Sequence, residues 1–207
     1  YSPMEQNIPD YLGADAIIRF HADESEFKDW NGNTKRAINM TQSLKGRSVF
    51  CHYHDIMKIL NGFPSLIYGS GNDDLGPMNG GSLPYDLMKG ALRDNRVFVY
   101  GGTWPAPYTL AFIEAMMTGI PIVAIGQSLA EEIQGTSRAD VHHFYEIEHL
   151  IQNGQTGFIS NSIDELRQKV HQLLEDHELA KKIGQAERNK ALELFGKEKI
   201  KSQWKDF

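Results

Sequence analysis

Short apolar runs alternate with helical patterns along most of the chain. Residues 97–100 and 121–125 are continuously apolar, which is typical of strands that are buried on both faces of a parallel sheet. Between these runs, residues 107–118 have the length and the apolar content of a buried helix. This alternation predicts an α/β fold with a Rossmann-like, doubly wound parallel sheet.

The predicted elements follow one another with short connections. We expect strands at residues 16–20, 36–41, 65–68, 97–100, 121–125 and 157–160. We expect helices at residues 49–60, 83–94, 107–118, 144–152, 177–194 and from about residue 197. A further helix follows Ser162, because Ser162 and Glu165 have the spacing of a capping box.

The loops after the strands are the expected place for a ligand, because open parallel sheets bind ligands at the carboxyl ends of their strands. These loops are residues 42–47, 69–82, 101–109 and 126–144. The helix that follows the third of them offers unpaired backbone N–H groups around residues 108–110, with Glu114 one and a half turns further on. Helix N–H groups suit phosphates and a carboxylate suits a ribose, so the segment predicts a nucleotide diphosphate site.

Composition narrows the classes of function. The chain has 207 residues and a formal net charge of −6, which argues against nucleic acid as a partner because such surfaces normally carry a basic excess. Cys51 is the only cysteine, which excludes an internal disulfide and favours a reducing, cytoplasmic compartment. The most apolar region, residues 109–126, is interrupted by Glu114, Gly119 and Pro121, so it predicts a helix and a strand rather than a membrane span.

Several short motifs occur in a specific order in the second half of the chain. They read EAM at residues 114–116, PIVA at 121–124 and NGQTGF at 153–158, with Glu146 before the last. Their order and spacing resemble the C-terminal, nucleotide-sugar-binding domain of family 4 glycosyltransferases of the GT-B fold. Residues 162–195 look like the C-terminal helices of that family, and FHADESEF at residues 20–27 is similar to the entry to its domain.

The resemblance implies one half of a GT-B fold and retaining transfer of a glycosyl group, hexosyltransferase-like, from a nucleotide-diphosphate sugar to an unknown acceptor. It implies neither a metal nor a cofactor.

We expect a linker at residues 1–14, the nucleotide-sugar-binding domain at 15–195, and a C-terminal helix at 196–207 that packs on an N-terminal domain. That second domain would carry the acceptor site and most catalytic groups, so the catalytic residues are unknown here. The chain begins at Tyr1 and stops inside a helical pattern, which also indicates a fragment of a longer protein. Without the second domain we expect this fragment to be inactive. Its full protein is expected in the cytoplasm, with a place at the membrane surface left open.

The resemblance also assigns roles to residues. Glu114 corresponds to the second glutamate of the family's pair and would contact the donor ribose, whereas the first falls on Ala106. The expected contacts of the diphosphate are Lys45, Arg47, Tyr108, Thr109 and Leu110. The expected contacts of the nucleobase are Gly69, Ser82 and Leu83.

Other interpretations remain open at this point. Ala106, where the family has its first glutamate, and Thr41–Gln42, where the family's phosphate loop has a Gly-Arg pair, favour a degenerate, non-catalytic binding or assembly module. A nicotinamide-dependent oxidoreductase is disfavoured, because the chain lacks a GxGxxG fingerprint. We interpret His21, His142 and His143 as surface histidines rather than acid–base groups, and Cys51 as a core thiol rather than a metal ligand with His52 and His54.

Overall fold

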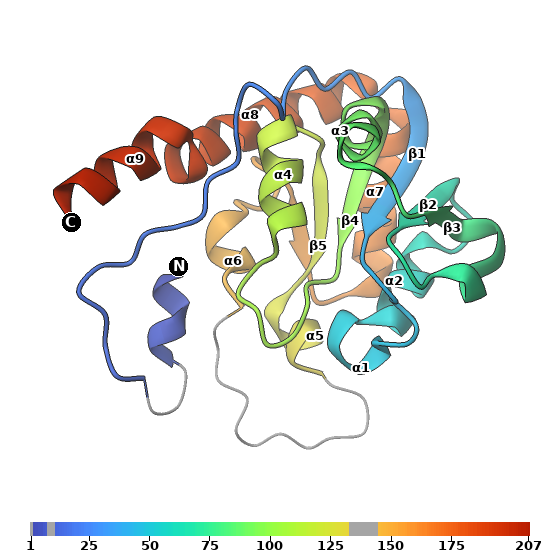
Figure 1. The fold of residues 1–207 in the computed structure, drawn as a ribbon. Helices are drawn as coiled ribbons and strands as arrows, with labels where there is room; N and C mark the ends of the chain where they lie inside the picture. The colour runs from blue at the N-terminus through green and yellow to red at the C-terminus, as the bar shows by residue number, and fades with distance from the viewer. Residues whose placement is uncertain (1, 8–10, 133–144) are drawn as a thin grey trace.

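The protein is described by a computed structural model that covers residues 2–7, 11–132 and 145–207. Its centre is a six-stranded sheet in the order β3-β2-β1-β4-β5-β6 (Figure 1). All neighbouring strands are parallel. The strands are β1 Thr34–Met40, β2 Ser65–Tyr68, β3 Asn79–Gly81, β4 Asn95–Tyr100, β5 Ile122–Ile125 and β6 Phe158–Ser160. The predicted doubly wound sheet is therefore confirmed.

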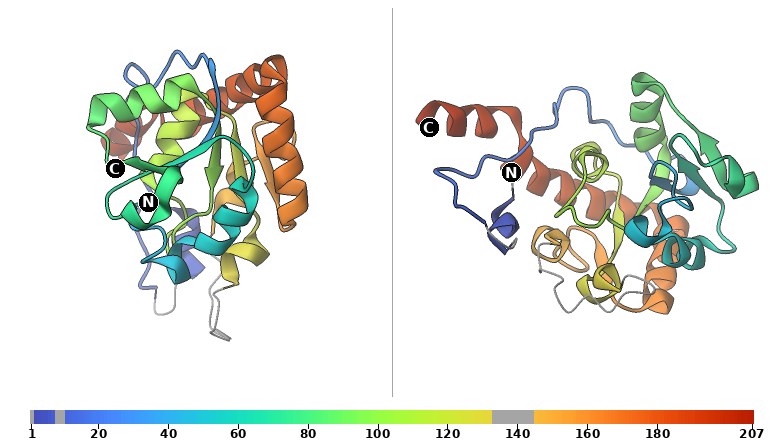
Figure 2. Two further views of the ribbon diagram at one scale, coloured as in Figure 1. Left: turned by 90° about the vertical axis from the view of Figure 1, so that its right-hand side faces the viewer. Right: turned by 60° about the horizontal axis from the view of Figure 1, so that its bottom comes forward.

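Helices cover both faces of this sheet. The α-helices are α1 Ser48–Cys51, α2 Tyr53–Leu60, α3 Tyr85–Asp94, α4 Leu110–Thr118, α5 Gln127–Glu131, α6 Ile147–Leu150, α7 Ile163–Glu175, α8 His177–Phe195 and α9 Lys197–Asp206, and the 3-10 helices are η1 Pro3–Asn7 and η2 Asp73–Met78. Helices α3 and α4 lie over one face, while α2 and α7 lie over the other (Figures 1 and 2). None of the helices in the described residues combines the length and the apolar character that crossing a bilayer requires.

The core lies around the neighbouring strands β4 and β5, in which every residue is buried. This burial explains the continuous apolar runs at residues 97–100 of β4 and 122–125 of β5. Helix α4 also packs against α8. At this contact Gly184 of α8 lies close to the backbone of Gly119, and a Cβ atom on Gly184 would be 2.0 Å from the Gly119 carbonyl oxygen. The predicted cap of α7 is confirmed, because Ser162 Oγ accepts a hydrogen bond from the backbone N–H of Glu165.

Three expectations about local structure are wrong. Residues 16–20 form no strand; their chain is held instead by the side chain of Arg19, which binds Glu146 and Tyr108. The helix expected at residues 49–60 is broken into α1 and α2 at His52, whose φ of 54° is left-handed. The loop at residues 69–82 contains η2 and the edge strand β3, which the sequence NGG does not announce.

The two ends of the chain lie on the same side of the molecule (Figures 1 and 2). Helix α9 projects away from the sheet there, and Trp204 and Phe207 at its end are 61% and 69% exposed. The N-terminal segment is tied to the body where Ser2 Oγ donates a hydrogen bond to Glu146 Oε2 over 2.6 Å.

Candidate functional site

The sheet reverses its direction of growth between β1 and β4. From β1 the chain adds β2 and β3 on one side, and it then returns to add β4, β5 and β6 on the other. Such a switch point leaves a crevice between the loops that follow the two central strands. A cleft of about 220 Å³ lies there, between the ends of β1 and β2, the beginning of α3 and one side of α4.

Glu114 enters this cleft from the second turn of α4. Its side chain is half-buried, and burial raises the pKa of its carboxyl group. Among the residues that the structure describes, no hydrogen-bond donor or cation is paired with this carboxylate. A half-buried carboxylate without a partner is costly, so the cleft offers a hydrogen-bond acceptor that a ligand can satisfy.

The residues expected at the nucleobase lie in the same cleft as Glu114. Gly69, Ser82 and Leu83 all line it. They come from the end of β2 and from the approach to α3, which the topology brings opposite α4. The residue expected at the ribose and the residues expected at the base therefore line one cleft.

Further residues line the cleft without having been assigned a ligand contact from the sequence. They are Met40, Thr41, Gln42, Tyr68, Ser70, Met88 and Ala111, of which Gln42 and Ser70 lie in the loops where a ligand was expected. Thr41 and Gln42 directly follow β1, and Ser70 follows β2 closely, so their place after a buried strand was the available signal. Apart from Glu114, the polar side chains of this lining are uncharged hydroxyl and amide groups.

The two cations expected at the diphosphate do not line the cleft. Lys45 Nζ lies 3.7 Å from Asp74 Oδ2, and both side chains are about half-exposed. Arg47 Nη1 donates a hydrogen bond to the carbonyl oxygen of Gln42 over 3.5 Å. Both cations therefore lie near the cleft but are engaged with groups of the chain itself.

The residues at the beginning of α4 differ in what their side chains can offer. The Thr109 hydroxyl caps the helix by accepting a hydrogen bond from Phe112 N over 3.4 Å. Tyr108 is buried, and its hydroxyl accepts a hydrogen bond from Arg19 Nη1 over 3.2 Å. Leu110 is exposed and borders a second pocket of about 200 Å³, which also contains His21 and shares Glu114 with the cleft. What this segment offers an anion is the backbone N–H groups of the first helical turn.

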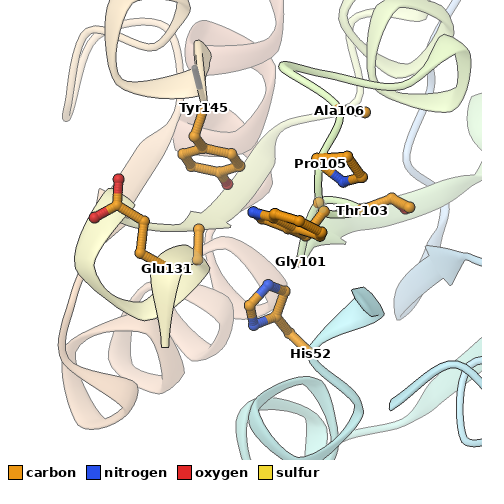
Figure 3. Close-up of a pocket in the computed structure, with 10 residues that line it drawn as sticks. His52, Gly101, Thr103, Pro105, Ala106, Glu131 and Tyr145 are labelled. Atoms are coloured by element: carbon orange, nitrogen blue, oxygen red, sulfur yellow. The ribbon is translucent and has the colours of Figure 1, made fainter. Parts of the chain in front are cut away.

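Ala106 lies at a smaller pocket of about 20 Å³ on the loop before α4. Figure 3 shows His52, Glu131 and Tyr145 around the loop that carries Ala106. Burial lowers the pKa of His52 and raises that of Tyr145, whose hydroxyl donates a hydrogen bond to Ile125 O over 2.9 Å. The side chain of Ala106 supplies no carboxylate to this pocket.

The remaining candidates line none of these three cavities or lie outside the described residues. Cys51 is buried, with its Sγ 3.8 Å from Thr103 Oγ1, in agreement with a core thiol. His142 and His143 lie outside the described residues.

Comparison with known proteins gives matches at the level of structure. No protein-family model and no curated protein sequence matches the chain. Among solved structures, HepE from Anabaena in complex with UDP matches with a TM-score of 0.67 and 17% identity, over 92% of this chain and 56% of HepE. Sucrose-phosphate synthase from Thermosynechococcus elongatus matches with a TM-score of 0.68 and 15% identity, over 99% of this chain and 55% of the synthase.

A third match is a mutant of TarM from S. aureus, crystallised in complex with fondaparinux, alpha-GlcNAc-glycerol and UDP. Its TM-score is 0.57 and its identity 17%, over 93% of this chain and 37% of TarM. The chain thus spans between about a third and just over a half of the proteins that it resembles. These likenesses establish the fold, which is one half of a GT-B fold.

Proposed function

We propose that this chain is the donor-binding domain of a retaining glycosyltransferase that uses a UDP-sugar. The fold is that of half a GT-B protein, and the similar structures include HepE solved with UDP-glucose at 15% identity and a TM-score of 0.61. At this level of identity the fold is shared while the ligand has to be argued from the cleft itself. The motifs of the sequence and the cleft at the switch point support a nucleotide-diphosphate sugar, and the choice of UDP rests on the nucleotide named for HepE.

The observation that carries the proposal is the position of Glu114. It places a half-buried carboxylate without a partner, within the described chain, at the crevice where the sheet reverses. A ribose presents two neighbouring hydroxyl groups, and a carboxylate can accept a hydrogen bond from each of them. Binding would therefore satisfy Glu114 and fix the orientation of the donor.

The diphosphate would extend from the ribose toward the beginning of α4. There the backbone N–H groups of residues 108–110, the positive end of the helix dipole, and Lys45 and Arg47 would meet its charge. Departure of UDP leaves negative charge on the diphosphate, so these groups would stabilise the transition state and not only the bound donor. Ala106 implies that the donor sugar is held without the carboxylate that the family places there.

The acceptor site and the catalytic groups would belong mostly to an N-terminal domain of the same protein. In this proposal α9 packs on that domain and covers the exposed side chains of Trp204 and Phe207. Residues 1–14 form the linker, and residues 15–195 act as the donor-binding unit. We propose a cytoplasmic protein that needs no metal or cofactor, and a chain that binds the donor nucleotide weakly and turns it over little by itself.

Calorimetric titration of the chain with UDP, GDP and ADP tests the proposal. We expect saturable binding of UDP, and a loss of at least about tenfold in affinity in Glu114→Gln, because one charged hydrogen-bond acceptor contributes about 1.5–3 kcal/mol. Glu193→Gln is the matched control, since Glu193 is an exposed helical glutamate that pairs with Lys190 away from the cleft. The absence of binding by any of the three nucleotides to the folded chain would refute the donor-binding role.

A second candidate is the degenerate binding or assembly module. Ala106 and the uncharged lining near the diphosphate position favour it. It predicts a folded chain that binds no nucleotide, so the same titration separates the two functions.

A further inference from the structure

Asn72 is a buried asparagine in the loop that follows β2. The residue is only 1% exposed. It occupies the position before η2, where asparagine commonly caps the helix with its side chain, yet its side chain makes no capping hydrogen bond. The side chain is used elsewhere.

The amide group of Asn72 joins the two loops that form one wall of the cleft. Its Nδ2 donates to Thr41 O over 2.8 Å and to Gly69 O over 3.1 Å. Its Oδ1 accepts from Leu44 N over 2.8 Å. Thr41 and Leu44 belong to the loop after β1, and Gly69 directly follows β2, so one side chain ties both strand ends together.

The backbone around these bonds leaves little freedom for the two loops to separate or to close. Ser43 N donates to Ser70 O over 2.8 Å. Gly69 has a φ of +137°, and a Cβ at this position would lie 2.6 Å from Thr41 O. The backbones of Gly69 and Thr41 are therefore so close that only glycine, which has no Cβ atom, fits at position 69.

Thr41, Gln42, Gly69 and Ser70 all line the cleft that contains Glu114. We infer that Asn72 is a positioning residue that holds these two loops at the separation which a bound nucleoside requires. The inference rests on the proposed function and adds a residue that does not itself line the cleft. An asparagine suits this role because it supplies two donors and an acceptor at once, whereas an aspartate supplies acceptors only.

Two variants of the full 207-residue chain test the inference by titration with UDP. In Asn72→Ala all three hydrogen bonds are lost, and in Asn72→Asp a carboxylate oxygen replaces the donor group that faces the two carbonyl oxygens. We expect the Kd for UDP to rise at least about tenfold in both variants, because small displacements of contact groups weaken a preformed site strongly.

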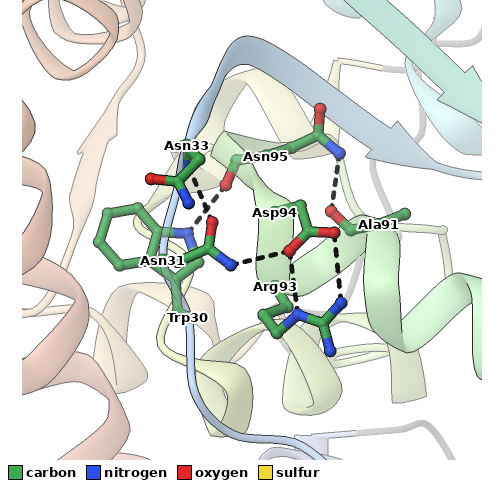
Figure 4. Close-up of polar contacts among 7 residues, drawn as sticks. All are labelled: Trp30, Asn31, Asn33, Ala91, Arg93, Asp94 and Asn95. Carbon is green, nitrogen blue, oxygen red and sulfur yellow. Dashed lines mark hydrogen bonds and ion pairs between the residues drawn. The ribbon is translucent and has the colours of Figure 1, made fainter.

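The matched control is Asn95→Ala. Asn95 is 4% exposed, and its Nδ2 donates to Ala91 O over 2.8 Å. It is the first residue of β4, whereas the cleft lies at the carboxyl ends of the strands. There it belongs to a network with Trp30, Asn31 and Asp94 (Figure 4). We expect Asn95→Ala to lower the melting temperature while the Kd for UDP stays within about twofold of the wild-type value. Equal weakening by Asn95→Ala, or unchanged binding by Asn72→Ala, would overturn the inference.

Amide hydrogen exchange of the ligand-free chain separates this inference from the proposed function. If Asn72 holds the loops, the N–H groups of Ser43 and Leu44 exchange faster in Asn72→Ala but not in Asn95→Ala. Unchanged exchange at Leu44 would refute the positioning role even where UDP binds. Wild-type protein that fails to bind UDP would refute the nucleoside site, while faster exchange in Asn72→Ala would still show that Asn72 holds the loops together.

Discussion

Arg19 and the buried Glu146 form an ion pair between segments 127 residues apart in the sequence. Arg19 Nη1 donates to Glu146 Oε2 over 2.9 Å, and Nη2 binds the other carboxylate oxygen. The side chains are 14% and 4% exposed. Because Arg19 also binds the hydroxyl of Tyr108, and Glu146 N donates to Pro107 O over 3.1 Å, the pair holds the segment that leads into α4.

Removing one partner of this pair should destabilise the protein strongly. Glu146→Gln leaves the Arg19 guanidinium buried without its counter-ion, and we expect a loss of about 3 kcal/mol in the free energy of unfolding. Urea denaturation measures this loss. The exposed pair Lys190 and Glu193 is the reference, since Glu193→Gln should change stability by less than about 0.5 kcal/mol. Similar effects at both pairs would mean that the buried pair contributes no more than a surface pair.

The contact between α4 and α8 should tolerate no side chain at Gly184. A Cβ there would lie 2.0 Å from the Gly119 carbonyl oxygen, so Gly184→Ala must push the helices apart, at a cost of about 2 kcal/mol or more. Gly90→Ala is the counterpart within α3, where a Cβ would approach only Arg93 Nη2 at 3.9 Å. It should stabilise the protein by about 0.5–1 kcal/mol. Thermal unfolding of both variants checks the opposite signs.

The doubly wound parallel sheet was predictable from the apolar runs at residues 97–100 and 121–125, whereas residues 16–20 were wrongly predicted as a strand for a specific reason. That segment reads as a strand, but its apolar residues are followed by Arg19, whose partner Glu146 the sequence cannot reveal. Its backbone therefore lies along the domain rather than in the sheet. Long-range side-chain pairing decided the outcome over local propensity.

Some residues of the candidate site were likewise predictable from the sequence, and others were not. Glu114 could be placed from its position in a helix after a buried strand, and Gly69, Ser82 and Leu83 from loops at the same edge. The engagement of Lys45 with Asp74 depends on the fold of the loop at residues 69–82, which no local pattern predicts. The role of Asn72 likewise depends on two loops that only the sheet brings together.

Glu187 should make the stability of the protein depend on pH. Its side chain is buried in α8, where Oε2 accepts from Ile122 N over 3.3 Å and Oε1 has no partner within the described residues. Burial raises the pKa of Glu187 well above its ordinary value of 4.5. The folded state therefore keeps its proton where the unfolded state loses it, and stability falls as the pH rises above the unfolded pKa.

Glu187→Gln removes this dependence and keeps an acceptor for Ile122 N. We expect it to raise the melting temperature at pH 7 by roughly 2–4 °C, which corresponds to about 1 kcal/mol for a domain of this size. The difference should shrink as the pH falls toward the ordinary glutamate pKa. A difference that stays constant between about pH 4 and pH 8 would contradict a protonated Glu187 in the folded state.

Glu114 should make ligand binding depend on pH in the opposite sense. Burial raises the pKa of its carboxyl group above the ordinary 4.5, and ribose hydroxyls bind best to the charged form. The affinity for the ligand should therefore have its full value at a pH above the raised pKa of Glu114, and it should fall as the pH drops through that pKa. Uridine is the suitable probe, because it carries no phosphate that titrates in this range, and Glu114→Gln should remove the dependence. Uridine binding that weakens at the same pH in Glu114→Gln would assign the titration to another group.

Lys45 and Asp74 should affect UDP binding in opposite directions. If Lys45 contacts the diphosphate, it must leave Asp74, from which its Nζ is 3.7 Å away. Lys45→Ala should then weaken UDP binding by roughly three- to tenfold, since an exposed charge contributes about 1 kcal/mol. Asp74→Asn removes the carboxylate that pairs with Lys45, and it should therefore strengthen UDP binding.

The control for this pair is Asp29→Asn, because Asp29 pairs with Lys28 at 3.9 Å, and both residues line a different pocket. It should leave the Kd for UDP unchanged, and uridine binding should be unaffected by all three substitutions because uridine has no phosphate. Added salt should reduce the effects of Lys45→Ala and Asp74→Asn by screening the charges. If Lys45→Ala binds UDP as the wild type does, while Glu114→Gln does not, the diphosphate is held by the N–H groups at the beginning of α4 without help from Lys45.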